Sequence, residues 1–268
     1  MSSESDLRRC ISNRRWIRCT NPFPHIRASD VFDPVFYENL EQAFLSILDR
    51  GLSENQDSTR FARSIRGYDA YSYAFTKHLE DPLRMFISQA WHDLLAGIAR
   101  VNATGDINGG LHHHLPGSDF GRIHNDFNPG WFIDDSVQGW PNVSDPNICN
   151  YWNGSTTVPN RPARETVRAV AMLFYLSNPK WAPGEGGETG LYDNIAQPID
   201  NPALAVPPIN NSLLVFECTP YSYHSFLRNT RNCRNSVILW LHRSKSEAVE
   251  RWGDDKIVRW PGGARVKA

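Results

Sequence analysis

The stretch GRIHNDFNPGWF, residues 121–132, places a histidine and an aspartate, His124 and Asp126, two positions apart. On an extended strand, side chains at positions i and i+2 project to the same face, so these two groups would point together. Imidazole and carboxylate both bind metal ions, and the pair predicts half of a metal site. The chain has 9 histidines, so a His-x-Asp triplet could also occur by chance. A metal site would need at least one more ligand from another part of the chain.

A second segment, LLVFECTPYSYHSFLRNTRNCRNSVILWLH, offers the missing ligand in His224. Two histidines and one carboxylate leave three adjacent metal positions open, which is the arrangement of non-haem Fe(II) oxygenases. A chelating 2-oxo acid would take two of these positions and dioxygen the third. Arg234 follows ten residues after His224, and its guanidinium would bind the far carboxylate of that acid, with a further hydroxyl donor from Ser236.

With these motifs the chain resembles the Fe(II)/2-oxoglutarate-dependent oxygenases, specifically their prolyl-4-hydroxylase-like branch. The resemblance covers about residues 105–245. Its matching pieces are HND at 124–126, GEGGETGLY at 184–192, NSLLVFECTPYSYHSF at 211–226 and RNSVILWLH at 234–242.

The resemblance implies a double-stranded β-helix, a jelly-roll or cupin-like barrel, that uses Fe(II) with 2-oxoglutarate and dioxygen as cosubstrates. It implies that His124, Asp126 and His224 bind the iron and that Arg234 with Ser236 holds 2-oxoglutarate. Related halogenases have a small residue at the position of Asp126, so the carboxylate here favours hydroxylation. Many prolyl hydroxylases have Tyr near the position of His114 and Lys near that of Arg234, so the resemblance does not fix the clade or the substrate.

Further residues are candidates for the same site. His112 and His114 would share one side of a strand, where either would contact 2-oxoglutarate or substrate, and Thr189 would line the cosubstrate site. Trp131 and Arg228 are candidates for substrate binding. The alternatives are that Trp131 packs its loop against the core and that Arg228 is a solvated turn residue. GEGGETG lacks the Lys-Ser/Thr ending of a phosphate-binding loop and predicts a turn that enters a strand.

The elements that must position these residues fall into two parts. Asp33-Pro34 and Asp81-Pro82 each begin an amphipathic pattern, which predicts helices over 33–51 and 81–101. After residue 105, short alternating or apolar runs predict an antiparallel sandwich or barrel, a mainly β fold buttressed by the helices. Trp240 lies in such a run and is expected in the core.

The predicted organisation is an N-terminal arm at 1–28 and one oxygenase domain at 29–268. The arm carries several arginines and is expected to be a solvated and partly ordered tail. Within the domain we expect a helical buttress at 29–104, a β-helix core at 105–245 and a C-terminal extension at 246–268. Residues 128–164, rich in Trp, Pro, Asn and Gly, predict a lid insertion within the core.

The amino-acid composition limits the kinds of molecule that this protein is expected to bind. The net charge is -1 in 268 residues, which argues against nucleic acid and membranes and favours a small polar molecule, such as an amino acid or a natural-product intermediate. No apolar run of 18 residues or secretory signal is seen, and the five cysteines form no CxxC pair, so a soluble cytoplasmic protein with free thiols is expected. Desaturation, cyclisation, demethylation, peptide hydroxylation and a non-catalytic binding barrel stay open as alternatives.

Overall fold

The computed structural model describes residues 3–63, 69–134 and 139–259, and the parts of the predicted arm, insertion and C-terminal extension that fall elsewhere lie outside the described residues. The helices are α1 Ser3–Cys10, α2 Pro34–Leu48, η1 Leu83–Ile87, α3 Gln89–Ala99, α4 Lys245–Trp252 and η2 Asp254–Lys256. The strands are β1 Ile17–Cys19, β2 His25–Ala28, β3 Leu52–Ser53, β4 Phe61–Ala62, β5 Tyr71–Ala74, β6 Asp106–His114, β7 Pro129–Phe132, β8 Asn142–Val143, β9 Arg164–Tyr175, β10 Thr189–Leu191, β11 Leu204–Val206, β12 Ser212–Glu217, β13 His224–Phe226 and β14 Arg234–Ser244.

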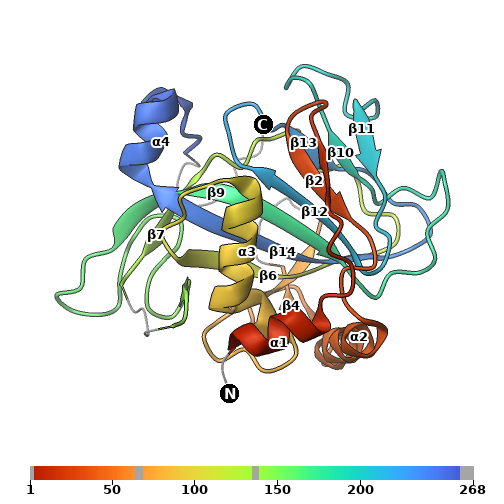
Figure 1. Ribbon diagram of the computed structural model, residues 1–268, viewed down its shortest axis with the longest axis horizontal. Helices are drawn as coiled ribbons and strands as arrows, with labels where there is room; N and C mark the ends of the chain where they lie inside the picture. Colours follow the sequence, from red (N-terminus) through yellow and green to blue (C-terminus); the bar gives the residue numbers. More distant parts are fainter. Residues whose placement is uncertain (1–2, 64–68, 135–138, 260–268) are drawn as a thin grey trace.

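Two sheets form the molecule, as the predicted mainly β fold requires. The larger has the order β1-β2-β12-β9-β14-β6-β5-β4-β3, with β7 on β9 and β8 on β6, and the smaller has the order β11-β10-β13. In Figure 1 the smaller sheet lies beside β2 and β12, and α3 lies across the large sheet, where it contacts β9 and β12. The prediction of a double-stranded β-helix flanked by helices is confirmed.

Alternation along the long central strands separates two apolar layers. On β14, Val237, Leu239 and Leu241 pack with the helices, whereas Ile238 and Trp240 face the smaller sheet. On β9, Phe174 likewise belongs to the helical layer. Because successive strand residues point to opposite faces, these same strands can pack on the helices and also present polar side chains to the space between the sheets.

The first predicted helix is confirmed, and the second is divided. α2 begins after Asp33, whose carboxylate accepts hydrogen bonds from the backbone N–H groups of Val35 and Phe36, with Pro34 in the first turn. The continuous helix predicted over 81–101 is wrong: a 3-10 turn ends at Ile87, and α3 starts after Ser88. The Ser88 backbone is extended, and its hydroxyl accepts from the N–H of Trp91, so it caps a new helix.

The arm at 1–28, predicted as a solvated and partly ordered tail, is built into the fold in its described part, and Leu7 and Cys10 of α1 belong to the hydrophobic core. Strand β2 pairs antiparallel with β12, with Ile26 opposite Val215, and β1 pairs with β2 to form the edge of the large sheet. His25 and Ile26 are buried there, so this segment supplies core contacts. A pairing between segments that lie so far apart along the chain leaves no local pattern in the sequence.

The segment 128–164 is partly built into the sheet. β7 pairs with the start of β9 and β8 runs parallel to β6, while the ring centroid of Trp140 lies 4.1 Å from the Arg84 guanidinium carbon.

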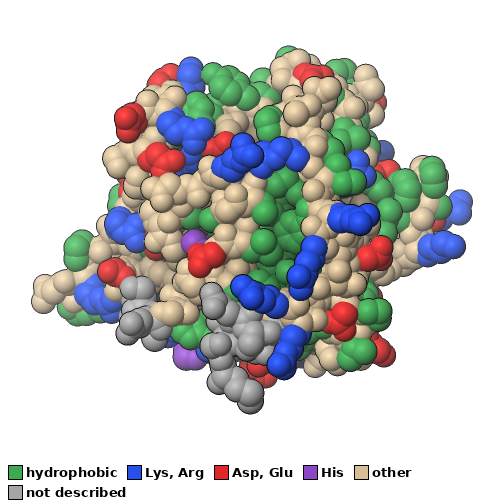
Figure 2. All heavy atoms as spheres, viewed as in Figure 1, with side chains coloured by type: hydrophobic (Ala, Val, Ile, Leu, Met, Phe, Trp, Pro, Cys, Tyr) green, Lys and Arg blue, Asp and Glu red, His purple; other side chains and the backbone are tan. Residues whose placement is uncertain are grey.

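None of the helices in the described part of the chain has the length and the apolar character that a membrane span needs. On the face in Figure 2, Lys and Arg side chains border a strip of apolar side chains, with acidic side chains scattered elsewhere, in keeping with the near-neutral net charge.

Candidate metal and cosubstrate site

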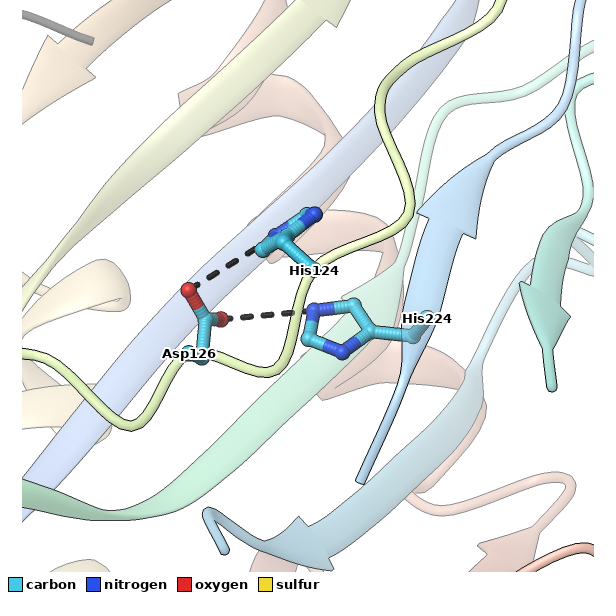
Figure 3. Close-up of side chains that lie close together, drawn as sticks. All are labelled: His124, Asp126 and His224. Carbon is cyan, nitrogen blue, oxygen red and sulfur yellow. Dashed lines mark ion pairs between the residues drawn. The ribbon is translucent and has the colours of Figure 1, made fainter. Parts of the chain in front are cut away.

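Three side chains from two segments converge between the sheets (Figure 3). His124 and His224 face each other across a two-way backbone bridge, with N···O distances of 3.0 and 2.8 Å, and their rings lie 4.3 Å apart. The ligand atoms of His124, Asp126 and His224 all lie within 4.8 Å of one another. Asp126 has a positive φ of 52°, so a turn brings the carboxylate to the imidazoles, rather than the strand alternation that we expected.

Each imidazole is oriented by its other nitrogen. The Nδ1 atom of His124 lies 2.7 Å from the carbonyl oxygen of Arg122, and that of His224 lies 3.0 Å from the carbonyl oxygen of Ser222. A carbonyl can only accept, so both Nδ1 atoms carry hydrogen in these bonds and a neutral ring leaves its Nε2 lone pair available. Those Nε2 atoms lie 3.6 and 3.4 Å from the two oxygens of Asp126. Three donors that face one another in this way fit a divalent cation.

The carboxylate of Asp126 is held at both oxygens by residues that the sequence reasoning missed. Arg168 donates from Nη1 to Oδ1 at 2.7 Å, and Trp240 donates from Nε1 to Oδ2 at 2.8 Å. Burial by itself would raise the pKa of Asp126, but the Arg168 guanidinium beside it holds this pKa well below its ordinary value. The carboxyl group is therefore ionised, as a metal ligand must be.

Arg168 belongs to a buried chain of hydrogen bonds. Its Nε donates to the hydroxyl of Tyr151 at 3.0 Å, and that hydroxyl lies 2.8 Å from Nε2 of His242. Burial, followed by the nearby Arg168, lowers the pKa of His242 to about 3, so this imidazole is neutral near pH 7. Its Nδ1 donates to the carbonyl of Asp106, and Tyr151 then donates to its Nε2.

A second buried guanidinium, that of Arg234, lies among neutral groups. It donates to the hydroxyls of Ser236 at 2.8 Å and Thr189 at 3.2 Å, and Thr189 in turn bonds the hydroxyl of Tyr175 at 2.7 Å. Arg234 is 2% exposed, its Nε has no hydrogen-bond partner, and no carboxylate of the described residues forms an ion pair with it. A buried cation without an anion fits a carboxylate ligand.

The cavity between the sheets has a volume of about 270 Å³. It brings together the three metal-binding candidates, both buried arginines and, from the predicted insertion, Tyr151 and Trp152. The predicted site residues in its wall are His112, His124, Asp126, Thr189, His224 and Arg234.

Four other candidates lie elsewhere. Ser236 is buried behind Arg234, and His114 pairs with Arg234 across the β6–β14 ladder and stacks on Phe226 at 3.9 Å, so both support the arginine from behind. Trp131 lines a smaller hollow, and Arg228 is half exposed with its guanidinium 2.7 Å from Asp119. The predicted substrate contacts of Trp131 and Arg228 are therefore not supported by their positions.

Two signals in the sequence pointed to the missed residues. Arg168 is a charge inside the otherwise apolar run VRAVAMLFYL, and a buried charge needs a partner. Trp240 was expected in the core because its strand is apolar, yet its indole N–H lies at the cavity wall. GEGGETG forms the expected turn before β10, with positive φ at Gly184, Gly186 and Gly187.

Comparison with known proteins points to an oxygenase family. A family model described as 2OG-Fe(II) oxygenase superfamily matches residues 148–242, which include His224 and Arg234 but not His124 or Asp126. Over these residues the chain is similar to that superfamily. The similarity supports an oxygenase with Fe(II), 2-oxoglutarate and dioxygen as cofactor and cosubstrates. No curated protein matches the sequence significantly.

Solved structures of oxygenases give the fold. The prolyl hydroxylase of Trichoplax adhaerens, in complex with a hypoxia inducible factor oxygen degradation domain peptide fragment, aligns with a TM-score of 0.53 at 17% identity, covering 86% of this chain and 88% of that chain. A Pseudomonas putida prolyl-4-hydroxylase aligns with a TM-score of 0.49 at 19% identity, covering 82% and 92%. The first of these likenesses shows that this chain has the fold of that prolyl hydroxylase.

Proposed function

We propose that this oxygenase hydroxylates an unactivated C–H bond of a small polar molecule, with Fe(II) bound by His124, Asp126 and His224. The observation that carries the proposal is the convergence of these three ligand atoms within 4.8 Å in the wall of one cavity. When bound, Fe(II) and 2-oxoglutarate supply an oxidant for C–H bonds, with 2-oxoglutarate converted to succinate and CO2.

The chain's own residues orient the proposed metal ligands and bind 2-oxoglutarate. Arg122 and Ser222 fix the tautomer of the two histidines through their carbonyls, and Arg168 and Trp240 fix the carboxylate. Arg234 binds the far carboxylate of 2-oxoglutarate, because its donors match a carboxylate and its present partners are neutral. Thr189 and Ser236 hold the arginine in that position.

The cavity supports a small substrate. About 270 Å³ lies near the lower end of ligand pockets, which hold roughly 300–1,000 Å³, and 2-oxoglutarate takes part of this space. Ser144, Tyr151 and Trp152 from one segment and Gln56, Asp57 and Ser58 from another line the cavity, so two segments outside the central strands contribute to its wall. A small-molecule partner and a cytoplasmic location stay predictions.

Anaerobic titration with Fe(II) and then 2-oxoglutarate tests the proposed ligands. We expect a weak visible charge-transfer band of the chelate in the wild type, its loss in Asp126→Ala and His224→Ala, and a higher 2-oxoglutarate requirement in Arg234→Ala. His78→Ala and Asp119→Ala are matched controls, since both residues are exposed. A full band in the Asp126 and His224 variants would contradict the proposed metal site.

A peptide is the second candidate substrate, because the Trichoplax adhaerens protein with this fold is in complex with a peptide fragment. Succinate release in the presence of free amino acids, compared with short peptides, separates the two. Stimulation by peptides alone would overturn the small-molecule proposal and leave the iron site intact.

A further inference from the structure

Arg168 presents an unused donor to the cavity. Its Nη1 bonds Asp126 and its Nε bonds Tyr151, but none of the hydrogen bonds within the described residues uses Nη2. The side chain lines the cavity although the residue is only 1% exposed. A guanidinium has five N–H donors, so one face of this group is available to a ligand in the cavity.

Aromatic residues hold this guanidinium in place. Its central carbon lies 3.8 Å from the ring centroid of Trp240 and 5.6 Å from that of Trp152. Tyr151 accepts from Nε and itself donates to the neutral His242. Tyr151 and Trp152 both come from segment 128–164, so this segment fixes the direction in which Arg168 points. A donor that is fixed in advance loses little entropy when it binds.

Charge in the cavity favours an anionic ligand. The charged side chains that line it in the described part of the chain are Asp57, Asp126, Arg168 and Arg234, and Asp57 is already paired with Arg60 at 2.7 Å. Fe(II) and the 2-oxoglutarate dianion cancel, and Asp126 offsets only one of the two arginines. One positive charge is left over in a site of low dielectric, where an unpaired charge is costly.

We propose that Arg168 binds a carboxylate of the substrate through Nη2, so that the oxygenase selects small carboxylic acids. The inference rests on the proposed function, since it assumes that iron and 2-oxoglutarate occupy their sites. Because Arg168 also bonds Asp126, the substrate carboxylate would lie beside the metal-binding carboxylate. Tyr151 is a positioning residue for this contact.

Acetate and its neutral analogue acetamide are suitable probes. The anaerobic protein loaded with Fe(II) and 2-oxoglutarate is titrated with each, and the total tryptophan fluorescence, to which Trp152 and Trp240 beside Arg168 contribute, is followed beside the visible band. We expect a saturable fluorescence change with acetate and none with acetamide, while the band persists. An equal response to both probes would overturn the proposal, and so would bleaching of the band by acetate, which would place the anion at the 2-oxoglutarate site.

Variants separate a binding role from a structural one. We expect Arg168→Gln to weaken acetate binding by about ten-fold or more, in keeping with loss of a charge-assisted bond. Arg168→Lys should restore part of the affinity, and Tyr151→Phe should weaken it a few-fold because the charge remains but its support is lost. The surface variant Arg228→Gln should bind as the wild type does.

The remaining outcomes also bear on the subsite. Unchanged acetate binding in Arg168→Gln contradicts the proposal. If Arg168→Gln loses the visible band as well, Arg168→Lys and Tyr151→Phe decide between the two roles, and wild-type affinity in both would overturn the proposal. If the wild-type protein never gives the visible band, the proposed function is wrong. If the wild-type protein gives the band but does not bind acetate, only the proposed Arg168 subsite is wrong.

Discussion

At the residue scale, the metal-binding candidate Asp126 is fixed by two donors of different kinds. Arg168 supplies charge at Oδ1, and the indole of Trp240 supplies a neutral hydrogen bond at Oδ2. Such supporting bonds orient a ligand before the metal arrives, and their loss typically lowers metal affinity by about 10–100-fold. The two contributions can be separated, because Trp240 can lose its N–H while an aromatic ring remains.

We therefore expect Trp240→Phe to weaken Fe(II) binding by roughly ten-fold with little change in fold. Trp16→Phe is the matched control, since the Trp16 indole donates at 2.8 Å to the Asn13 carbonyl, which is not among the residues that line the cavity. Anaerobic Fe(II) titration of the two variants and the wild type measures the effect. Equal affinity in all three would show that the indole bond does not orient Asp126.

His242 gives a prediction of pH dependence. Its pKa is about 3 in the folded chain, against 6.5 for an unperturbed histidine, so the unfolded chain binds a proton at higher pH than the folded one does. Stability from this group is thus present above about pH 6.5 and is lost as the pH falls toward 3. Between pH 7 and pH 5 the loss is about 2 kcal/mol.

We expect His242→Gln to remove this share of the acid sensitivity, although it also lowers stability at pH 7 by weakening the bond to Tyr151. Urea unfolding of both proteins at pH 7 and pH 5 tests it, with the difference between the two pH values as the readout. Burial also lowers the pKa values of His25, His113 and His114, and these contribute equally to both proteins. An unchanged difference in the variant would mean that His242 is protonated in the fold.

At the element scale, the turn before β10 shows how a glycine run positions residues of the proposed cosubstrate site. A side chain at Gly186 would overlap the carbonyl oxygen of Arg228, whereas one at Gly184 would meet no atom within 4 Å, and both glycines have positive φ. Three residues after Gly186 comes Thr189, which accepts from Arg234. The close approach of two backbones therefore requires glycine at one position and only favours it at the other.

Replacing each glycine by alanine separates the two effects. Gly184→Ala should cost roughly 1–2 kcal/mol, the usual penalty for a positive φ. Gly186→Ala adds overpacking of about 1–3 kcal/mol and should also weaken 2-oxoglutarate binding, because the turn must move. Urea unfolding and 2-oxoglutarate titration give both quantities. Similar values for the two variants would contradict a tight backbone contact at Gly186.

The elements also show what local sequence can predict. The start of α2 could be predicted because Asp33 and Pro34 act within one turn, and the break before α3 depends on Ser88, a capping residue that lay within an otherwise helical pattern. Strand β2 could not, since its partner β12 lies far along the chain. The turn at Asp126 left only a weak signal, because Asp tolerates a positive φ better than most residues but HND does not require one.

At the scale of the whole molecule, the candidate site depends on contacts between distant segments. The ligands at 124, 126 and 224 were predicted through a family resemblance that carries their order along the chain. Arg168 was missed because its contact with Asp126 spans 42 residues, and most of that span is the segment 128–164. Only the folded chain shows that this segment supplies Tyr151 and Trp152 to the same cavity.

The helical layer and the large sheet share one hydrophobic core, as the predicted single domain requires. Trp91 of α3 is fully buried, with its ring 5.6 Å from Phe32 and 5.7 Å from Phe86, and Phe32 lies 5.2 Å from Phe174 of β9. A helix that unfolded alone would expose this cluster and one face of β9. We therefore expect helices and metal site to be lost together on heating.

Trp91→Ala tests this coupling. It should cost about 3–5 kcal/mol and lower the midpoint of unfolding by roughly 10 °C. Far-ultraviolet circular dichroism and the visible band of the Fe(II) and 2-oxoglutarate complex should shift by the same amount, because one cooperative unit holds both signals. Val35→Ala is the control, since Val35 is 69% exposed on α2 and should leave both midpoints unchanged. A variant whose helical signal melts first, with the band retained, would show that the helices form a separate unit and that the β-helix alone maintains the metal site.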